Sequence, residues 1–130
     1  MPPSAARPIL KPRRRIPSGQ RESVGMKHYF LRLLPPRPWA HPGAMTADEA
    51  AIMQAHAAYW RGLLEAGKAV AFGPVADPAG LYDVGLLALD EGEDPHIIAR
   101  ADPALRAGTG FRTEISPMLA LVHNERETRA

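Results

Sequence analysis

The residues of this chain that could move protons are its histidines and aspartates. Among the five histidines, His56 differs from the others because it lies in the apolar stripe of a predicted helix. An imidazole has an ordinary pKa of about 6.5, so it can act as a general acid or base at neutral pH. The simpler interpretation is a buried histidine that packs its ring and donates one hydrogen bond. The residues alone leave both interpretations open.

A carboxylate beside His56 would fix its tautomer and stabilise the imidazolium. Three aspartates precede prolines, where they could serve a turn, a helix cap or a site. For Asp94 we expect a helix cap only. For Asp102 a cap and a site role are equally favoured, whereas for Asp77 a turn is somewhat favoured. The candidate site residues are therefore His56, then Asp102, then Asp77.

Most other chemistry finds no support in the sequence. Without cysteine the chain has no disulfide, no thiol nucleophile and no thiolate metal site. No two histidines have the i, i+4 spacing of a helical metal pair, and there is no HExxH motif. Gly108-Thr109-Gly110 precedes a predicted strand, so it is not a dinucleotide fingerprint, and there is no P-loop or GxSxG. We therefore expect neither a metal nor a cofactor.

The charge of the chain is concentrated at its start. Residues 1–25 hold six basic residues and one acidic residue, a net charge of +5, whereas residues 26–130 hold 10 basic and 13 acidic residues, a net charge of −3. The first segment also has five prolines and few apolar residues, so we expect a disordered basic extension that is not essential. A targeting role or contact with nucleic acid is less favoured.

The remaining 105 residues suit one globular domain, because 45% of the chain is apolar and 23% is charged. We place this domain at residues 26–122, followed by a frayed charged end over 123–130. No apolar run approaches the roughly 20 residues that a membrane helix needs. We expect a cytoplasmic protein with no membrane partner.

Hydrophobic periodicity predicts elements in the order β-α-β-β-α-β. A capping box of Thr46 and Glu49 begins the first helix, Gly67 ends it, and Asp94 begins the second. A single turn to Gly108 follows the second helix. The predicted strands are 27–34, 68–75, 81–89 and 111–117, and the predicted helices are 47–66 and 95–102.

This order is typical of an α+β, ferredoxin-like fold, with two helices on one face of a four-stranded antiparallel sheet. The other face then needs cover. In the third strand Leu86, Leu87, Ala88 and Leu89 are apolar in both phases, as in a strand that is covered on both faces. We therefore expect a homodimer that pairs sheet to sheet.

Three segments together resemble the YCII-related (YciI-like) domain family: MKHYFLRLLPPRP, MTADEAAIMQAHAAYWRGLLEAGKAVAFGPVADPAG and ADPALRAGTGFRTEISPM. The resemblance covers about residues 26–119. It implies a ferredoxin-like fold of the dimeric α/β-barrel superfamily and a histidine–aspartate site. The histidine position matches His56, and the aspartate maps to Asp102, with Asp77 as second choice. The superfamily includes small-molecule isomerases, monooxygenases and a dehydrochlorinase acting on a chlorinated aromatic.

The resemblance also shows one departure. Relatives often have an aspartate just before the Met-Thr of the capping box, where this chain has Ala44. The leading hypothesis is a cofactor-independent lyase, isomerase or dehydrochlorinase-like enzyme acting on a small cyclic organic molecule through His56 and an aspartate. The alternative is a non-catalytic dimeric binding or stress-related module that retains a vestigial pocket.

Overall fold

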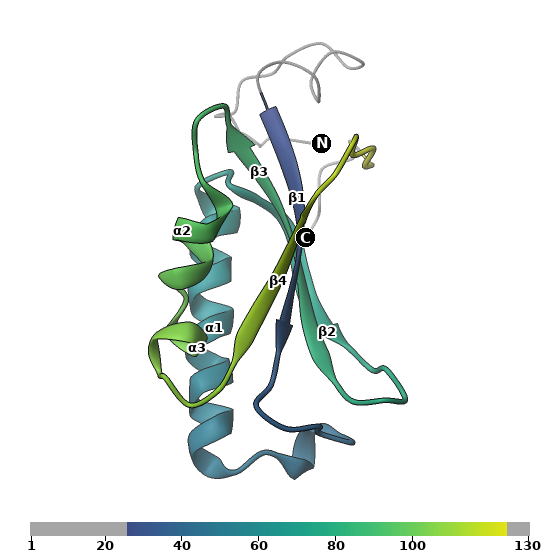
Figure 1. The fold of residues 1–130 in the computed structure, drawn as a ribbon, viewed down its shortest axis with the longest axis vertical. Coiled ribbons are helices and arrows are strands. Elements are labelled where there is room, and N and C mark those ends of the chain that lie inside the picture. The colour runs from purple at the N-terminus through teal and green to yellow at the C-terminus, as the bar shows by residue number, and fades with distance from the viewer. Residues whose placement is uncertain (1–25, 125–130) are drawn as a thin grey trace, which may run out of the picture.

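The computed structural model describes residues 26–124 of the chain. Four antiparallel strands form one sheet in the order β2-β3-β1-β4. Helix α1 lies across one face of the sheet with the short helices α2 and α3 beside it (Figure 1). The strands are β1 (Met26–Leu34), β2 (Ala69–Val75), β3 (Tyr82–Asp90) and β4 (Arg112–Pro117), and the helices are α1 (Ala47–Glu65), α2 (Pro95–Arg100) and α3 (Pro103–Arg106).

The predicted β-α-β-β-α-β order is confirmed, and the α+β arrangement is consistent with a ferredoxin-like fold. Most strand and helix boundaries differ from the prediction by no more than one residue, and one differs by two. The second helix ends at Arg100 instead of residue 102, because Asp102 is extended and begins the separate turn of α3. A further short 3-10 helix, Pro42–Ala44, lies in the loop before α1.

Predictions for residues 1–25 and 125–130 lie outside the described part of the chain. Residues 121–124 have no regular secondary structure. Within residues 26–124, no helix combines the length and the apolar character that crossing a membrane would require.

Local hydrogen bonds define both ends of α1. The Thr46 side chain accepts from the backbone N–H of Glu49 at 3.1 Å, and Glu49 Oε1 accepts from the backbone N–H of Thr46 at 2.9 Å. At the other end Gly67 has a φ of 77°, a conformation that costs glycine little. There the N–H of Lys68 reaches the carbonyl of Leu63 at 2.8 Å, as in a Schellman motif. These two ends hold His56 near the middle of the helix.

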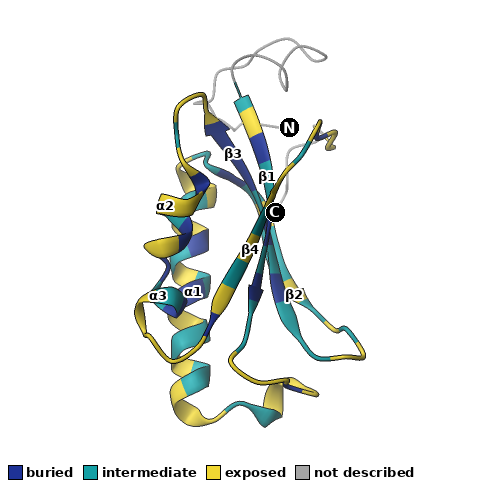
Figure 2. Cartoon of the chain, viewed as in Figure 1, coloured by how far each residue is buried: buried dark blue, intermediate teal, exposed yellow. Residues whose placement is uncertain are grey.

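The core lies between the helices and the sheet. Tyr29, Leu31 and Leu33 share the helix-facing side of β1, as the alternation predicts, and Leu31 and Leu33 are each 2% exposed. In Figure 2 buried residues are concentrated in β1 and β3, while exposed residues lie mainly on the helices and loops. The opposite face of the sheet carries half-buried side chains, including Phe30 and Leu86, which are paired in register.

A glycine in β3 makes room for the largest core side chain. Gly85 is buried opposite Leu31 of β1 and Phe72 of β2. A Cβ at this position would lie 2.5 Å from Cζ3 of Trp60, closer than real contacts allow. The indole of Trp60, 1% exposed, therefore rests directly on the β3 backbone.

We predict that Gly85→Ala destabilises the protein by about 1–3 kcal/mol, because the added methyl group overpacks the site and displaces Trp60. Urea unfolding measures the change. Gly73→Ala in β2 is the matched control, since a Cβ there meets nothing within 4 Å. Equal stability of the two variants would contradict this account of Gly85.

Candidate functional site

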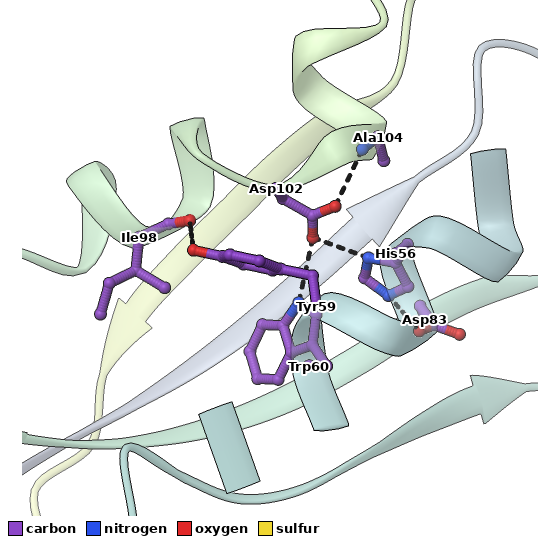
Figure 3. Close-up of polar contacts among 7 residues, drawn as sticks. All are labelled: His56, Tyr59, Trp60, Asp83, Ile98, Asp102 and Ala104. Atoms are coloured by element: carbon purple, nitrogen blue, oxygen red, sulfur yellow. Dashed lines mark hydrogen bonds and ion pairs between the residues drawn. The ribbon is translucent and has the colours of Figure 1, made fainter. Parts of the chain in front are cut away.

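His56 bridges two buried carboxylates. Its Nδ1 lies 2.7 Å from Asp102 Oδ2, and its Nε2 lies 2.7 Å from Asp83 Oδ2 (Figure 3). The exposed fractions are 2% for His56, 6% for Asp83 and 2% for Asp102. Three ionisable groups from α1, β3 and the start of α3 are thus in direct contact within the protein interior.

Asp102 caps α3 and also contacts His56. One oxygen, Oδ1, caps α3 by accepting from the backbone N–H of Ala104 at 2.9 Å. The other oxygen, Oδ2, faces α1 and also accepts from the indole N–H of Trp60 at 3.0 Å. The cap orients the carboxylate so that its second oxygen is directed at His56.

Helix α1 holds the α2–α3 segment by neighbouring side chains of one face. His56 and Trp60 both bond to Asp102, and the hydroxyl of Tyr59 donates to the carbonyl of Ile98 at 2.8 Å (Figure 3). Burial and the charge of Asp102 raise the pKa of Tyr59. The tyrosine is therefore a neutral hydrogen-bond donor that supports the segment.

Asp83 is the site residue that the sequence analysis missed, because it does not precede a proline. It lies on the helix-facing side of β3 and pairs with Leu33 of β1. A signal was available in the alternation of the strand, since Asp83 shares its phase with the buried residues Leu87 and Leu89. A carboxylate in that phase indicates a buried charge that needs a partner.

The structure does not place Asp77 with His56. Its Oδ1 accepts from the backbone N–H of Ala79 at 2.8 Å, and its carbonyl accepts from the N–H of Gly80 at 2.9 Å. Asp77 therefore shapes the turn between β2 and β3, and the second-choice partner for His56 was wrong. Both ring nitrogens of His56 are engaged by Asp83 and Asp102 instead.

His56 and Asp83 lie at the wall of a cavity of about 270 Å³. Neither lysine nor arginine is among the described residues that line it, and apolar side chains make up most of its surface. Ala44 is not part of the lining, although its neighbour Met45 is. The principal apolar walls are Leu33, Trp39, Met45, Met53, Phe72 and Phe111.

The two carboxylates decide the charge of His56. Burial lowers the pKa of His56 by disfavouring imidazolium, but the hydrogen bonds to Asp102 and Asp83, together with their negative charges, raise it to about 9. At neutral pH the ring is therefore imidazolium, and each N–H donates to one carboxylate. Neither nitrogen then has a lone pair free for a metal. Among residues 26–124, no three histidine, cysteine or acidic side chains are arranged to hold a metal ion.

We predict that stability falls as the pH rises through about 9. The pKa of His56 is raised to about 9 in the folded protein, against about 6.5 in an unfolded chain. A group whose pKa rises on folding stabilises the folded state fully at pH values below its pKa in the unfolded chain. This stabilisation is lost as the pH rises through its pKa in the folded protein. Urea unfolding at several pH values should show that the free energy of unfolding decreases by up to about 3 kcal/mol between about pH 6.5 and about pH 9.

An NMR titration of the His56 ring separates the contributions of the carboxylates. Asp102→Asn and Asp83→Asn should each lower the pKa of His56, because each removes a negative charge beside the ring. Asp77→Asn is the matched control and should leave that pKa unchanged. If neither site variant moves the pKa of His56, the ring is only a packing residue.

Most of the described chain matches a known domain family. Residues 29–119 match the family model of the YCII-related domain, and the match includes His56, Asp83 and Asp102. No curated protein shows a significant match to the chain. Because the match spans most of the 130 residues, this chain belongs to the YCII-related domain family.

Proposed function

We propose that this protein is a cofactor-independent enzyme that moves a proton on a small organic molecule bound in the apolar cavity. The observation that carries the proposal is the buried imidazole held between two carboxylates at the wall of that cavity. Membership of the YCII-related family fits a module of this kind that binds small molecules.

A purely structural histidine would not need this environment. A buried ring is satisfied by one backbone or hydroxyl partner, whereas His56 has two carboxylates as partners, each less than a tenth exposed. Burying such charges costs more than their attraction usually returns. A titratable residue with a strongly shifted pKa beside a cavity is more typical of a functional site.

The geometry supports a division of roles within the site. Asp102, held by Ala104 and Trp60, fixes the orientation of the ring. The imidazolium of His56 places a positive charge and a proton beside Asp83 and the cavity. Such an arrangement can accept a proton from a bound molecule and return one to it, as isomerisation and elimination both require.

The test is proton exchange in D₂O. We predict that the wild-type chain speeds deuterium incorporation at carbon into at least one member of a panel of small cyclic enols and phenols, followed by mass spectrometry. His56→Gln should slow the exchange by about 10²–10⁴-fold, because it breaks up the histidine–aspartate unit that moves the proton, and a positioned acid–base unit usually contributes that much.

His96→Gln is the control, because His96 is exposed and its ring contacts Asp94, two residues earlier in the chain. Circular dichroism should show an unchanged fold in both variants. If the His56→Gln variant exchanges deuterium as fast as the wild type, the proposal of an enzyme is refuted. Binding of panel members without any exchange would favour the alternative, a non-catalytic binding module.

We propose further that two copies pair through the open face of the sheet, as in a dimeric α/β barrel. The helices cover the opposite face, and this face carries the half-buried side chains Phe30, Leu34, Val84 and Leu86. Obligate homodimer interfaces bury roughly 2,000 Å² or more of surface. A sheet face of this kind supplies apolar area for such an interface.

We predict a dimer mass in light scattering at micromolar concentration. Leu86→Lys should shift the protein toward monomer, because it places a charge in the centre of the interface. Ala58→Lys, on the exposed side of α1, is the matched control and should remain dimeric. A stable wild-type monomer at that concentration would rule out the pairing.

A further inference from the structure

A carboxylate oxygen of Asp83 is free to meet a bound molecule at the cavity wall. His56 and Asp83 both line the cavity, whereas Asp102 does not. Both ring nitrogens of His56 are engaged by carboxylates at 2.7 Å. Asp83 uses only Oδ2 for His56, and within the described part of the chain its Oδ1 has no hydrogen-bond partner. Figure 3 shows this second oxygen directed away from the ring.

The charge around Asp83 indicates which molecules the cavity accepts. Neither lysine nor arginine is among the described lining residues. An anionic ligand would therefore face the carboxylate of Asp83, and no lysine or arginine would balance the charge of the ligand. A cationic ligand would approach a carboxylate that already has the His56 imidazolium at 2.7 Å, and the two positive charges would repel. An uncharged molecule with an O–H or N–H donor meets neither obstacle.

The size and walls of the cavity indicate the body of that molecule. A cavity of roughly 150 Å³ with apolar walls can hold benzene, and this one measures about 270 Å³. Trp39, Met53, Phe72 and Phe111 supply flat apolar walls around the single free carboxylate oxygen. One substituted six-membered ring fits these dimensions and surfaces.

We infer that the cavity takes an uncharged, ring-sized molecule that donates one hydrogen bond to Asp83 Oδ1, and that Asp83, not His56, exchanges the proton with it. The inference rests on the proposed function and deepens it. The ligand X–H bond breaks, its electron pair stays on the ligand, and an O–H bond forms at Asp83 Oδ1. The imidazolium of His56 stays bonded to Asp83 Oδ2, so its positive charge remains beside the cavity wall. Asp83 then returns the proton to a second atom of the ligand, so the site ends as it began.

The test compares four probes of similar size on the full chain at pH 7: phenol, toluene, benzoate and benzylamine. We expect phenol to bind at least tenfold more tightly than each of the others in an NMR titration. Equal binding of phenol and toluene, preference for either charged probe, or no binding of any probe would overturn the ligand class. This comparison uses the wild-type protein and does not depend on a variant that folds.

The role of Asp83 is tested in the deuterium-exchange assay. Asp83→Asn removes the base, and its one amide oxygen is needed by the Nε2–H of His56, which leaves the NH₂ group facing the ligand. Phenol should therefore lose its preference over toluene, while exchange falls at least 100-fold. Asp77→Asn, a matched change in the turn before β3, should exchange like the wild type. Full exchange in Asp83→Asn together with loss in His56→Gln would overturn the role of Asp83 and leave the proposed function standing. Full exchange in both variants would overturn both.

Discussion

The bridge from Asp102 through His56 to Asp83 is the interaction on which the rest of the arrangement depends. It joins three elements that are far apart in the chain, since His56 lies 27 residues before Asp83 and 46 before Asp102. Each of these groups would be costly to bury alone, because an ionised side chain loses its hydration in the interior. Their mutual attraction compensates the lost hydration only when α1, β3 and the start of α3 take their observed positions.

Packing around the bridge reinforces this geometry. Trp60, one turn after His56, donates to Asp102 and rests on the bare backbone at Gly85. The capping box at Thr46 and the Schellman turn at Gly67 define the ends of α1, and therefore where His56 stands above the sheet. A site built on a helix and a central strand is held more firmly than one on loops. The support of His56 is thus part of the fold itself.

The apolar walls of the cavity affect the strength of the charge interactions in the bridge, and the bridge sets the charge at the cavity wall. The cluster of Leu33, Trp39 and Phe111 keeps the surroundings of Asp83 apolar, and charges interact more strongly in a medium of low dielectric. The same apolar surroundings disfavour any unpaired charge. The bridge satisfies this constraint because the imidazolium of His56 lies between the carboxylates of Asp83 and Asp102. The charged groups at the described cavity wall are thus a carboxylate of β3 and the imidazolium that it contacts.

The sequence by itself determined the elements and their order, because these depend on neighbours within a few residues. The alternation of β1, the capping box at Thr46 and the cap at Asp94 are all present in the structure. The position of His56 in the apolar stripe of α1 was equally local, and the Asp-Pro pattern brought Asp102 forward as a candidate. The end of α2 shows the limit, because the helix stops at Arg100 and not at residue 102, although a cap at Asp102 was one of the two roles expected.

Only the tertiary structure decided which carboxylates meet His56. Asp77 and Asp102 have the same local Asp-Pro pattern, yet one closes the β2–β3 turn and the other faces α1. Asp83 was not a candidate from the sequence, and the strand register sets it opposite Leu33 and beneath the helix. These choices depend on strand register and on how the helix packs over the sheet. Residues 27 and 46 positions apart come together only through that packing, so no local pattern encodes it.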